Sequence, residues 1–452
     1  MIIIYGGKMK RIFLTVLIVL LCSLLFSGIS ASALDPQYET IQIGLSYGST
    51  AKSSVTVASV CGFNAGYMSD SYYKDFGYSF GEVTLTIKPY SATEITINDV
   101  VYNTCEGNFA LLPINGEINI DGTIYRGGVK IIPDANGLLT VVNFVNINSY
   151  IAGVIGKEMS PSWPIEALKA QAVCARSYAI RNWHKHSSRG FNLCNTQDCQ
   201  VYFGISGESE STLLASEETK DQVIKYGSEI AEALYSSSNG GSIGYSKYVW
   251  GKDVPYLVAS DDPYDAASAN PRSSWKVSLT KGQIKDKLSQ SGIDIGDITD
   301  LKVTGADEYG RTYEVTIFGT NGNHVLKNDK TRSFLGFYSQ KYTITPVGGE
   351  GDSSVPSLFA LVSERVSYVD NYTIIGANGT MVKKDNLFVK SSSDTKQYHM
   401  TAPVLSPDSF VISGSGWGHG LGMSQYGAKV MAEMGFGYAD ILAFYYKGVE
   451  LC

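Results

Sequence analysis

Residues 150–182 read YIAGVIGKEMSPSWPIEALKAQAVCARSYAIRN and join an apolar run to an amphipathic segment. The apolar run is strand-like and leads to Glu158. Pro164 suits the first turn of a helix, and Glu166 favours a helix N-terminus. Behind them, small apolar residues recur at helical spacing and form a stripe that allows close packing. We therefore expect a strand that ends in a carboxylate, followed by a helix over residues 164–182.

The regions on both sides of this stretch read mainly as strands. Apolar and polar residues alternate over residues 41–45, 83–87 and 117–120, and residues 138–145 form another candidate strand. Strand patterns return at 223–235 and 298–344, and a final amphipathic helix is expected at 424–434. The expected fold class is α+β, with a mixed-sheet core and short helices. The expected divisions are a leader (1–33), a β-rich domain (34–148), a core (149–346), a linker with a β-rich insert (347–400) and a segment that completes the core (401–452).

The first 33 residues have the features of an export signal. Lys8, Lys10 and Arg11 precede a nearly continuous apolar run, and residues 31–33, Ala-Ser-Ala, read as a cleavage site before Leu34. The apolar run also approaches the length of a membrane anchor, so cleavage and anchoring both stay open. The net charge is −7 and no basic stripe is present, which argues against a nucleic-acid partner.

The seven cysteines are too few for a disulfide scaffold in a chain of 452 residues. Cys61 and Cys105 could form one bridge. A second group, His184, His186, Cys194 and Cys199, directly follows the helix. Two histidines and two cysteines this close in sequence can hold zinc in a tetrahedral site. The alternative is a disulfide between the two cysteines with two solvated histidines.

Glu158 is the first candidate for chemistry. A carboxyl group against apolar neighbours loses hydration, which raises its pKa and suits it to donate a proton. The alternative is a surface glutamate on a loop. On the helix that follows, Lys169, Gln171 and Arg176 are candidates to line a groove. Most polar residues of such a helix simply face solvent, and Arg176 could instead pair with a buried carboxylate.

Two further segments could contact a ligand. Residues 234–241, LYSSSNGG, place small hydroxyl residues beside glycines, which allow close approach of the backbone. Candidates there are Tyr235 and Ser238, with Trp250 and Tyr256 nearby as rings for stacking. A tight turn with core aromatics explains the same pattern, and this reading suits Tyr256 best.

The last segment, residues 413–428, reads SGSGWGHGLGMSQYGA. Glycine occupies every second position from 414 to 422. In a strand, this spacing would leave one face without side chains and give room for a flat ligand. Trp417 and His419 would then share the other face, with Gln425 close behind. The spacing is not that of a dinucleotide-binding loop.

Taken in order, these segments resemble the SpoIID/LytB family. The resemblance is carried by Tyr150-x-x-Gly153-Val154-x-x-x-Glu158-Met159, by residues 166–173 and 175–179, and by residues 413–428. It runs from about residue 120 to the C-terminus and is weakest in the insert at 358–389 and at the beginning of the chain.

The resemblance implies a peptidoglycan-binding core with two possible roles. The SpoIID branch implies a lytic transglycosylase that acts on glycan strands stripped of stem peptides during engulfment in sporulation, with Glu158 as its catalytic acid. The LytB branch implies an amidase enhancer, which modulates another enzyme. The implied partners are glycan strands and a wall amidase or other engulfment proteins. The implied substrate-binding residues are Lys169, Gln171, Arg176, Tyr235, Ser238, Trp250, Trp417, His419 and Gln425.

The resemblance also raises the expectation of zinc at His184, His186, Cys194 and Cys199. Such a closed site would be structural, and catalysis needs no cofactor. A glycan hydrolase of the usual kind needs two carboxylates, whereas lytic cleavage needs one. Asp261 and Asp262 are candidates for a second catalytic carboxylate, so hydrolysis stays open as an alternative. A surface adhesin would fit the β-rich insert but leaves the glutamate and glycine motifs unexplained.

Overall fold

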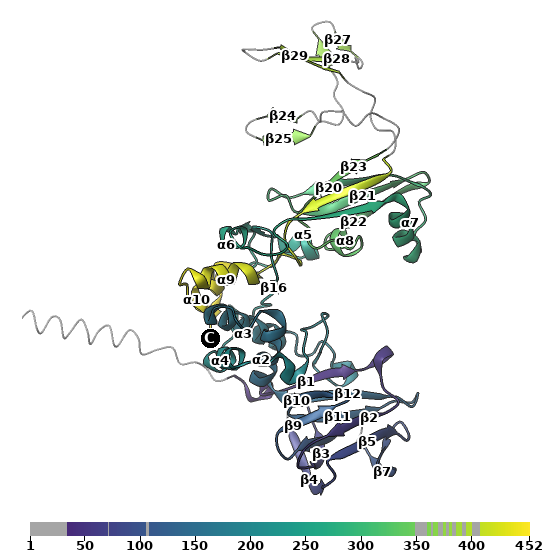
Figure 1. Ribbon diagram of the computed structural model, residues 1–452, viewed down its shortest axis with the longest axis vertical. Coiled ribbons are helices and arrows are strands. Elements are labelled where there is room, and N and C mark those ends of the chain that lie inside the picture. Colours follow the sequence, from purple (N-terminus) through teal and green to yellow (C-terminus); the bar gives the residue numbers. More distant parts are fainter. Residues whose placement is uncertain are drawn as a thin grey trace, which may run out of the picture. The chain divides into compact units, whose positions relative to one another are not determined.

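The computed structural model describes residues 34–70, 72–104, 108–348 and 407–452, together with the backbone of six short strands between residues 359 and 399. It contains several sheets and short helices, so the expected α+β class is confirmed (Figure 1). The expected leader and Cys105 lie outside the described residues. Within the described ranges, no helix combines the length and apolarity that crossing a bilayer requires.

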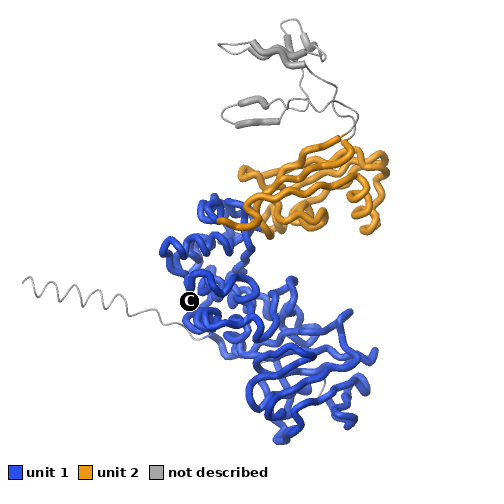
Figure 2. The backbone as a smooth tube through the Cα atoms, viewed as in Figure 1, with its two compact units in different colours: residues 1–245, 254–268, 420–452 blue, residues 246–253, 269–419 orange. Residues whose placement is uncertain are grey.

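The chain forms two compact units (Figure 2). Unit 1 contains the chain up to Tyr245, residues 254–268 and residues 420–452. Unit 2 contains residues 246–253 and 269–419. Unit 1 is therefore complete only when the C-terminal segment, residues 420–452, packs against its earlier elements.

Unit 1 begins with two sheets. The first has the strand order β13-β1-β12-β11-β8-β3-β4, and the second has the order β10-β9-β2-β5-β6-β7. The strands expected from alternation are confirmed as β1 (Thr40–Ser46), β5 (Thr84–Pro89), β9 (Glu117–Ile120) and β12 (Leu139–Asn146). The remaining strands are β2 (Val55–Ala58), β3 (Phe63–Met68), β4 (Tyr73–Phe80), β6 (Glu94–Ile97), β7 (Val100–Asn103), β8 (Phe109–Pro113), β10 (Thr123–Arg126), β11 (Gly128–Pro133) and β13 (Leu193–Cys194).

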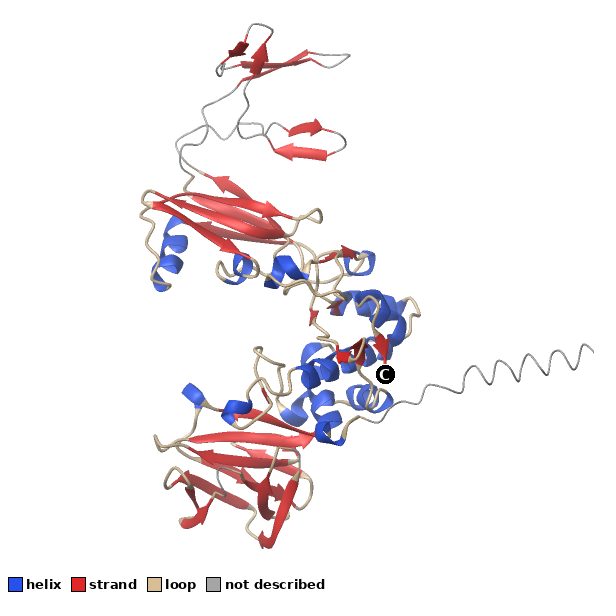
Figure 3. Cartoon of the chain, turned by 180° about the vertical axis from the view of Figure 1, so that it is seen from behind, coloured by secondary structure: helices blue, strands red, loops and turns tan. Residues whose placement is uncertain are grey.

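Helices dominate the rest of unit 1 (Figure 3). The expected helix at 164–182 is confirmed as α3 (Ile165–Arg181), and the expected C-terminal helix is confirmed as α9 (Gln425–Glu433). They are joined by α4 (Glu210–Glu218), α6 (Pro263–Ala266) and α10 (Tyr438–Tyr445). Short strand pairs join the segments between these helices. One is the parallel pair of β16 (Tyr235–Ser236) and β31 (Met423–Ser424).

The apolar run before Glu158 is a helix, so the expected strand was wrong. Helix α2 (Ile147–Glu158) is N-capped by Asn146, whose side chain accepts a hydrogen bond from the Asn148 N–H. Most of its residues are buried, so no polar face marks the helical period. A Cβ added at Gly156 would collide with the carbonyl oxygen of Gly207. The glycines in this run therefore serve close packing of a buried helix.

Unit 2 contains two three-stranded sheets around one apolar core. The strand orders are β19-β30-β23 and β20-β21-β22. Trp275, Ile284, Ile317 and Phe410 are among the buried core residues. The elements are α5 (Ser246–Trp250), β19 (Trp275–Thr280), α7 (Lys281–Gln290), β20 (Ile298–Ala306), β21 (Thr312–Gly319), β22 (Gly322–Lys327), α8 (Lys330–Ser333), β23 (Tyr342–Val347) and β30 (Ser409–Gly414). The expected strands over 298–344 are confirmed.

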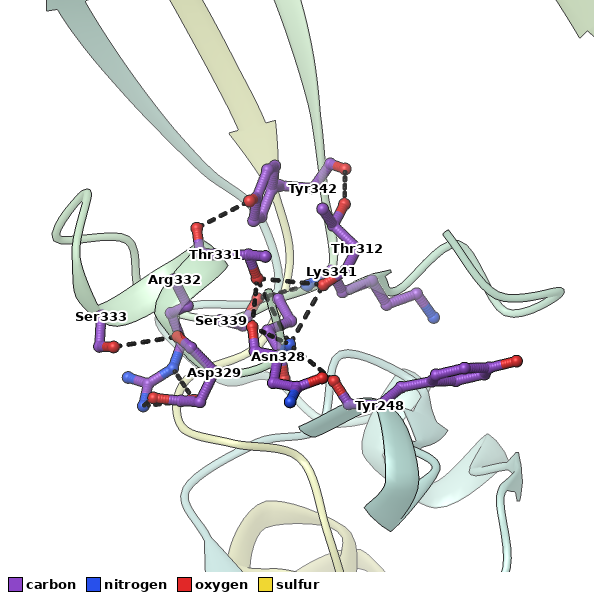
Figure 4. A network of polar contacts seen from close by, with 11 residues as sticks. Tyr248, Thr312, Asn328, Asp329, Thr331, Arg332, Ser333, Ser339, Lys341 and Tyr342 are labelled. Carbon is purple, nitrogen blue, oxygen red and sulfur yellow. Dashed lines mark hydrogen bonds and ion pairs between the residues drawn. The ribbon is translucent and has the colours of Figure 1, made fainter. Parts of the chain in front are cut away.

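A polar network joins four of these elements (Figure 4). The buried Gln340 amide donates to the carbonyl oxygens of Asn328 and Thr312 at 2.9 and 3.1 Å. The Tyr342 hydroxyl donates to the Thr331 carbonyl oxygen at 2.8 Å. These bonds fix the ends of β21, β22 and β23 against α8. Between β23 and β30, the described strands pair as β24 (Phe359–Val362) with β25 (Arg365–Tyr368), β26 (Ile374–Gly376) with β27 (Gly379–Met381), and β28 (Asn386–Lys390) with β29 (Thr395–His399).

The glycine-rich segment is a loop, so the expectation of a glycine-faced strand was also wrong. Strand β30 ends at Gly414, and the next four alternate glycines all have positive φ. The values are 85° at Gly416, 111° at Gly418, 71° at Gly420 and 62° at Gly422. Side chains other than hydrogen disfavour this conformation. The alternating glycines therefore turn the backbone repeatedly.

Candidate functional site

Glu158 is the last residue of α2 and is partly buried. Burial raises the pKa of its carboxyl group, and a hydrogen bond from Gln425 lowers it in part. The Gln425 Nε2 atom donates to Glu158 Oε2 at 3.1 Å. The raised pKa expected from the sequence is thus confirmed in direction. A carboxyl group in this state can hold a proton at a higher pH than an exposed glutamate does.

Gln171 completes this group from α3. It is fully buried, and its Oε1 atom accepts a hydrogen bond from Gln425 Nε2 at 3.4 Å. Its Nε2 atom is buried and has no hydrogen-bond partner among the described residues. Three helices, α2, α3 and α9, therefore bring one carboxyl group and two amides together.

Tyr235 is electrostatically coupled to Glu158. Burial raises the pKa of the Tyr235 hydroxyl, and the charge of Glu158 raises it further, so the phenol stays protonated. Its oxygen accepts a hydrogen bond from Gln200 Nε2 at 2.9 Å, while Gln200 Oε1 accepts one from the Tyr150 hydroxyl at 3.1 Å. Gln200 was missed in the sequence because no motif surrounds it.

Two of the expected substrate-binding residues on α3, Lys169 and Arg176, instead make contacts within the protein that give them a structural role. Lys169 forms ion pairs with Glu166 and Glu218 at 2.8 and 2.6 Å. Arg176 is fully buried. Its guanidinium group donates to backbone carbonyl oxygens at the end of α4 and to Asn148 Oδ1, rather than to the buried carboxylate considered from the sequence.

Ser238 belongs to a buried polar cluster. Its hydroxyl donates to Asp265 Oδ2 at 3.0 Å, and Asp265 Oδ1 accepts from the Ser424 hydroxyl at 2.6 Å. Neighbouring Asp262 accepts from the Tyr445 hydroxyl at 2.9 Å, and burial raises its pKa. Asp261, by contrast, is exposed. These bonds fasten the segment after β16 to α6 and α9.

The remaining candidates are aromatic residues and one histidine. Trp250 and His419 lie in unit 2, with ring centroids 5.6 Å apart. Trp417 also lies in unit 2 and is 48% exposed. Tyr256 is buried in unit 1, where its hydroxyl accepts a hydrogen bond from the Glu232 N–H at 2.8 Å. Tyr256 is therefore a core aromatic, which agrees with the reading that suited it best.

A possible metal site lies between α3 and η4 (Gly204–Gly207). His186, Cys194, Asp198 and Cys199 each offer a ligand atom, and these atoms lie within 4.8 Å of one another. The Cys199 Sγ and His186 Nε2 atoms are 3.4 Å apart, and both thiols are free. Asp198, which was missed in the sequence, belongs to this group, whereas His184 does not among the described residues. Thiolate, imidazole and carboxylate ligands suit zinc, so the group could hold a metal ion.

Comparison with known proteins identifies the central part of unit 1. Residues 135–226 match the SpoIID family model, described as stage II sporulation protein. The chain contains a SpoIID domain. This confirms the resemblance read from the motifs. The matched residues include Glu158, Gln171 and the possible metal ligands, whereas Tyr235 and Gln425 lie beyond the match.

Two relatives from Bacillus subtilis (strain 168) extend the likeness beyond the SpoIID domain. The amidase enhancer is 32% identical over 418 residues, which are 83% of this chain and 54% of that protein. The chain thus spans about half the length of that relative. Stage II sporulation protein D is 23% identical over 325 residues, which are 69% of this chain and 75% of that protein.

Proposed function

We propose that this chain is a peptidoglycan lytic transglycosylase of the SpoIID type, with Glu158 as its catalytic acid. The observation that carries the proposal is the state of this carboxyl group: partly buried, with a raised pKa, and bonded by Gln425. Gln171 supports it, because its Nε2 atom lies in the same polar group as Glu158 and Gln425 and has no hydrogen-bond partner among the described residues. The SpoIID family match supports it as well.

Lytic cleavage needs a single carboxyl group that first gives and then takes a proton. Glu158 donates its proton to the glycosidic oxygen as the bond from that oxygen to the anomeric carbon of a muramic residue breaks. The C6 hydroxyl oxygen of the same residue then bonds to the anomeric carbon. The Glu158 carboxylate takes the hydroxyl proton, which regenerates the acid and leaves a 1,6-anhydro end. No water is consumed.

The proposed substrate is glycan freed of stem peptides, and the proposed setting is the cell wall in engulfment or wall remodelling. The sporulation protein among the relatives and the family resemblance support this setting. The chain would be exported by its first 33 residues and then be released, or stay anchored to the outer face of the cytoplasmic membrane. Its partners would be glycan strands, with a wall amidase or other engulfment proteins.

A second candidate is a non-catalytic, wall-binding amidase enhancer. It is favoured by the amidase enhancer of Bacillus subtilis, to which 83% of this chain aligns. In that role the residues around Glu158 would hold a glycan strand without cleaving it. Faster release of stem peptides by an added amidase would then be the measurable activity.

We also propose that the metal site holds zinc as a structural ion. His186, Cys194, Asp198 and Cys199 would supply all four ligands of a tetrahedral site, leaving no open position for chemistry. Zinc would fasten the segment after α3 to β13, which pairs with β1 at the edge of the first sheet.

The deciding experiment is mass spectrometry of products from peptide-free glycan strands. We compare the chain from residue 34 onward with Glu158→Gln and with Glu433→Gln, a matched change of a glutamate on α9. Anhydro-ended fragments from all but Glu158→Gln are expected. Reducing ends would indicate a hydrolase and a second carboxylate. Retained binding without fragments, together with faster stem-peptide release by an added amidase, would favour the enhancer.

A further inference from the structure

An arginine in unit 2 lies among aromatic rings. The Arg272 guanidinium carbon is 4.0 Å from the ring centroid of Tyr338 and 5.1 Å from that of Trp417. The two rings meet edge to face, with centroids 5.9 Å apart. We name these three residues the arginine stack. A guanidinium group is planar and weakly hydrated, so it keeps its charge while it packs against rings.

The backbone holds the arginine stack in place. The Gly416 N–H donates to the Arg272 carbonyl oxygen, and the Gly418 N–H donates to the Tyr338 carbonyl oxygen, both at 2.8 Å. Trp417 lies between these two glycines and is thus fastened on both sides to its stacking partners. Two of the positive-φ glycines make these turns possible. The exposed Trp417 ring is therefore preorganised, which lowers the entropy cost of binding a ligand.

The charge of Arg272 is not neutralised within the described residues. The guanidinium group forms neither an ion pair nor a hydrogen bond there, and its Nε atom is buried without a partner. Arginines in such positions ordinarily donate to carboxylates or carbonyl oxygens, because an unpaired buried donor is costly. Arg176 in unit 1 shows the usual solution, with three backbone carbonyl oxygens as acceptors. Arg272 instead keeps its capacity to bind an anion.

We propose that the arginine stack binds a muramic residue through its free lactyl carboxylate. The sugar ring would lie on the exposed Trp417 ring while the Arg272 guanidinium pairs with the carboxylate. In intact peptidoglycan the lactyl carboxyl group forms an amide bond to the stem peptide and carries no charge. It becomes charged only after the peptide has been removed. The stack thus gives the protein a chemical means to recognise stripped strands, and the inference rests on the proposed glycan substrate.

The test uses one glycan in two chemical forms. Peptide-free strands carry free lactyl carboxylates, and coupling the same strands to methylamine converts these to neutral amides. Binding of both forms is measured by calorimetry with the chain from residue 34 onward, in a Glu158→Gln background that prevents turnover. Arg272→Gln is expected to weaken binding of the free form about tenfold and to leave the amide form unchanged. Arg272→Lys, which keeps the charge but not the planar fork, should fall between.

Lys285→Gln is the control, because it removes an equal charge from unit 2 at an exposed ion pair with Asp297. It should leave both affinities unchanged. Equal binding of the two forms by the parent protein would overturn the inference alone. So would an Arg272→Gln variant that weakens both forms equally and melts at a lower temperature, since the arginine would then be structural. A parent protein that binds neither form would overturn the proposed glycan substrate together with this inference.

Discussion

The proton affinity of Glu158 is set by two opposing contacts. Burial favours its neutral form, whereas the amide of Gln425 favours its charged form. Only the protonated form can donate to a leaving oxygen, so activity should fall as the pH rises through the pKa of this group. The balance between the two contacts therefore decides the alkaline limit of activity.

Replacing Gln425 with leucine tests this balance. The substitution removes the hydrogen bond that lowers the pKa of Glu158, so the pKa should rise further. The alkaline limb of the pH–rate profile is then expected to move to higher pH. Gln290→Leu, on the exposed face of α7, should leave the profile in place. An alkaline limb that stays put or moves to lower pH in Gln425→Leu would contradict this account of the carboxyl group.

Lys130 makes a second prediction at the residue scale. It is 3% exposed, and burial lowers its pKa to about 8, although its Nζ donates to the Gly190 carbonyl oxygen at 2.6 Å. An unfolded chain keeps this proton up to about pH 10. Between about pH 8 and 10 the unfolded state therefore binds more protons, and stability should rise with pH.

Lys130→Met should remove this dependence. We expect the variant to raise the free energy of unfolding by about 2 kcal/mol at pH 7, where the native lysine is still charged and buried. The gain should shrink at pH 9.5. Urea unfolding of both proteins at the two pH values measures it. A gain of equal size at both would mean that packing, not charge, separates the two proteins.

At the scale of elements, α2 shows where sequence patterns lose their information. Alternation located β5 and β9 of the second sheet because alternate residues of each strand are buried while the residues between them are more exposed. Helix α2 is buried over most of its surface, so the same test could not separate a helix from a strand. The alternating glycines from 414 to 422 led to a second wrong prediction, a strand, because periodicity was again the only information used. Their period matched a strand, but positive φ values make them a series of turns.

The glycine in α2 can be tested against a glycine that has no such role. At Gly156 a methyl group would collide with the Gly207 carbonyl oxygen, whereas at Gly282 in α7 the nearest atom is Thr280 Oγ1 at 3.8 Å. Gly156→Ala is expected to lower the free energy of unfolding by about 2 kcal/mol through overpacking. Gly282→Ala should instead raise it by about 0.5 kcal/mol, because alanine favours helices. Thermal unfolding that changes in the same direction for both would refute the packing argument.

At the scale of the whole molecule, the candidate site depends on the return of the C-terminal segment to unit 1. Glu158 and Gln425 lie 267 positions apart, and unit 2 is inserted between them in sequence. The motifs could be read from the sequence because each is local. Their pairing could not, since it follows from the packing of α9 on α3 and of β31 on β16. Gln200 was missed because no motif surrounds it, although its side chain contacts both Tyr150 and Tyr235 in the fold.

The possible metal site makes the last prediction, because it connects the helices of unit 1 with its first sheet. Cys194 lies in β13, which pairs with β1, while His186 follows α3. A zinc ion held by both would stabilise the folded state by its binding free energy. The protein as purified should contain about one zinc ion per chain, and chelation should lower its Tm by about 5 °C.

Cysteine variants separate this prediction from a disulfide. Cys199→Ser should lose the zinc and melt like the chelated protein, whereas Cys61→Ser, a change at an exposed free cysteine, should keep both zinc and Tm. Elemental analysis measures the zinc content of each variant, and the mass of the intact chain shows whether a disulfide has formed. A chain without zinc whose mass is lower by two hydrogens, a loss that Cys199→Ser abolishes and Cys61→Ser does not, would mean that Cys194 and Cys199 are bonded to each other. Chelation would then leave the Tm unchanged, and a reductant would lower it instead.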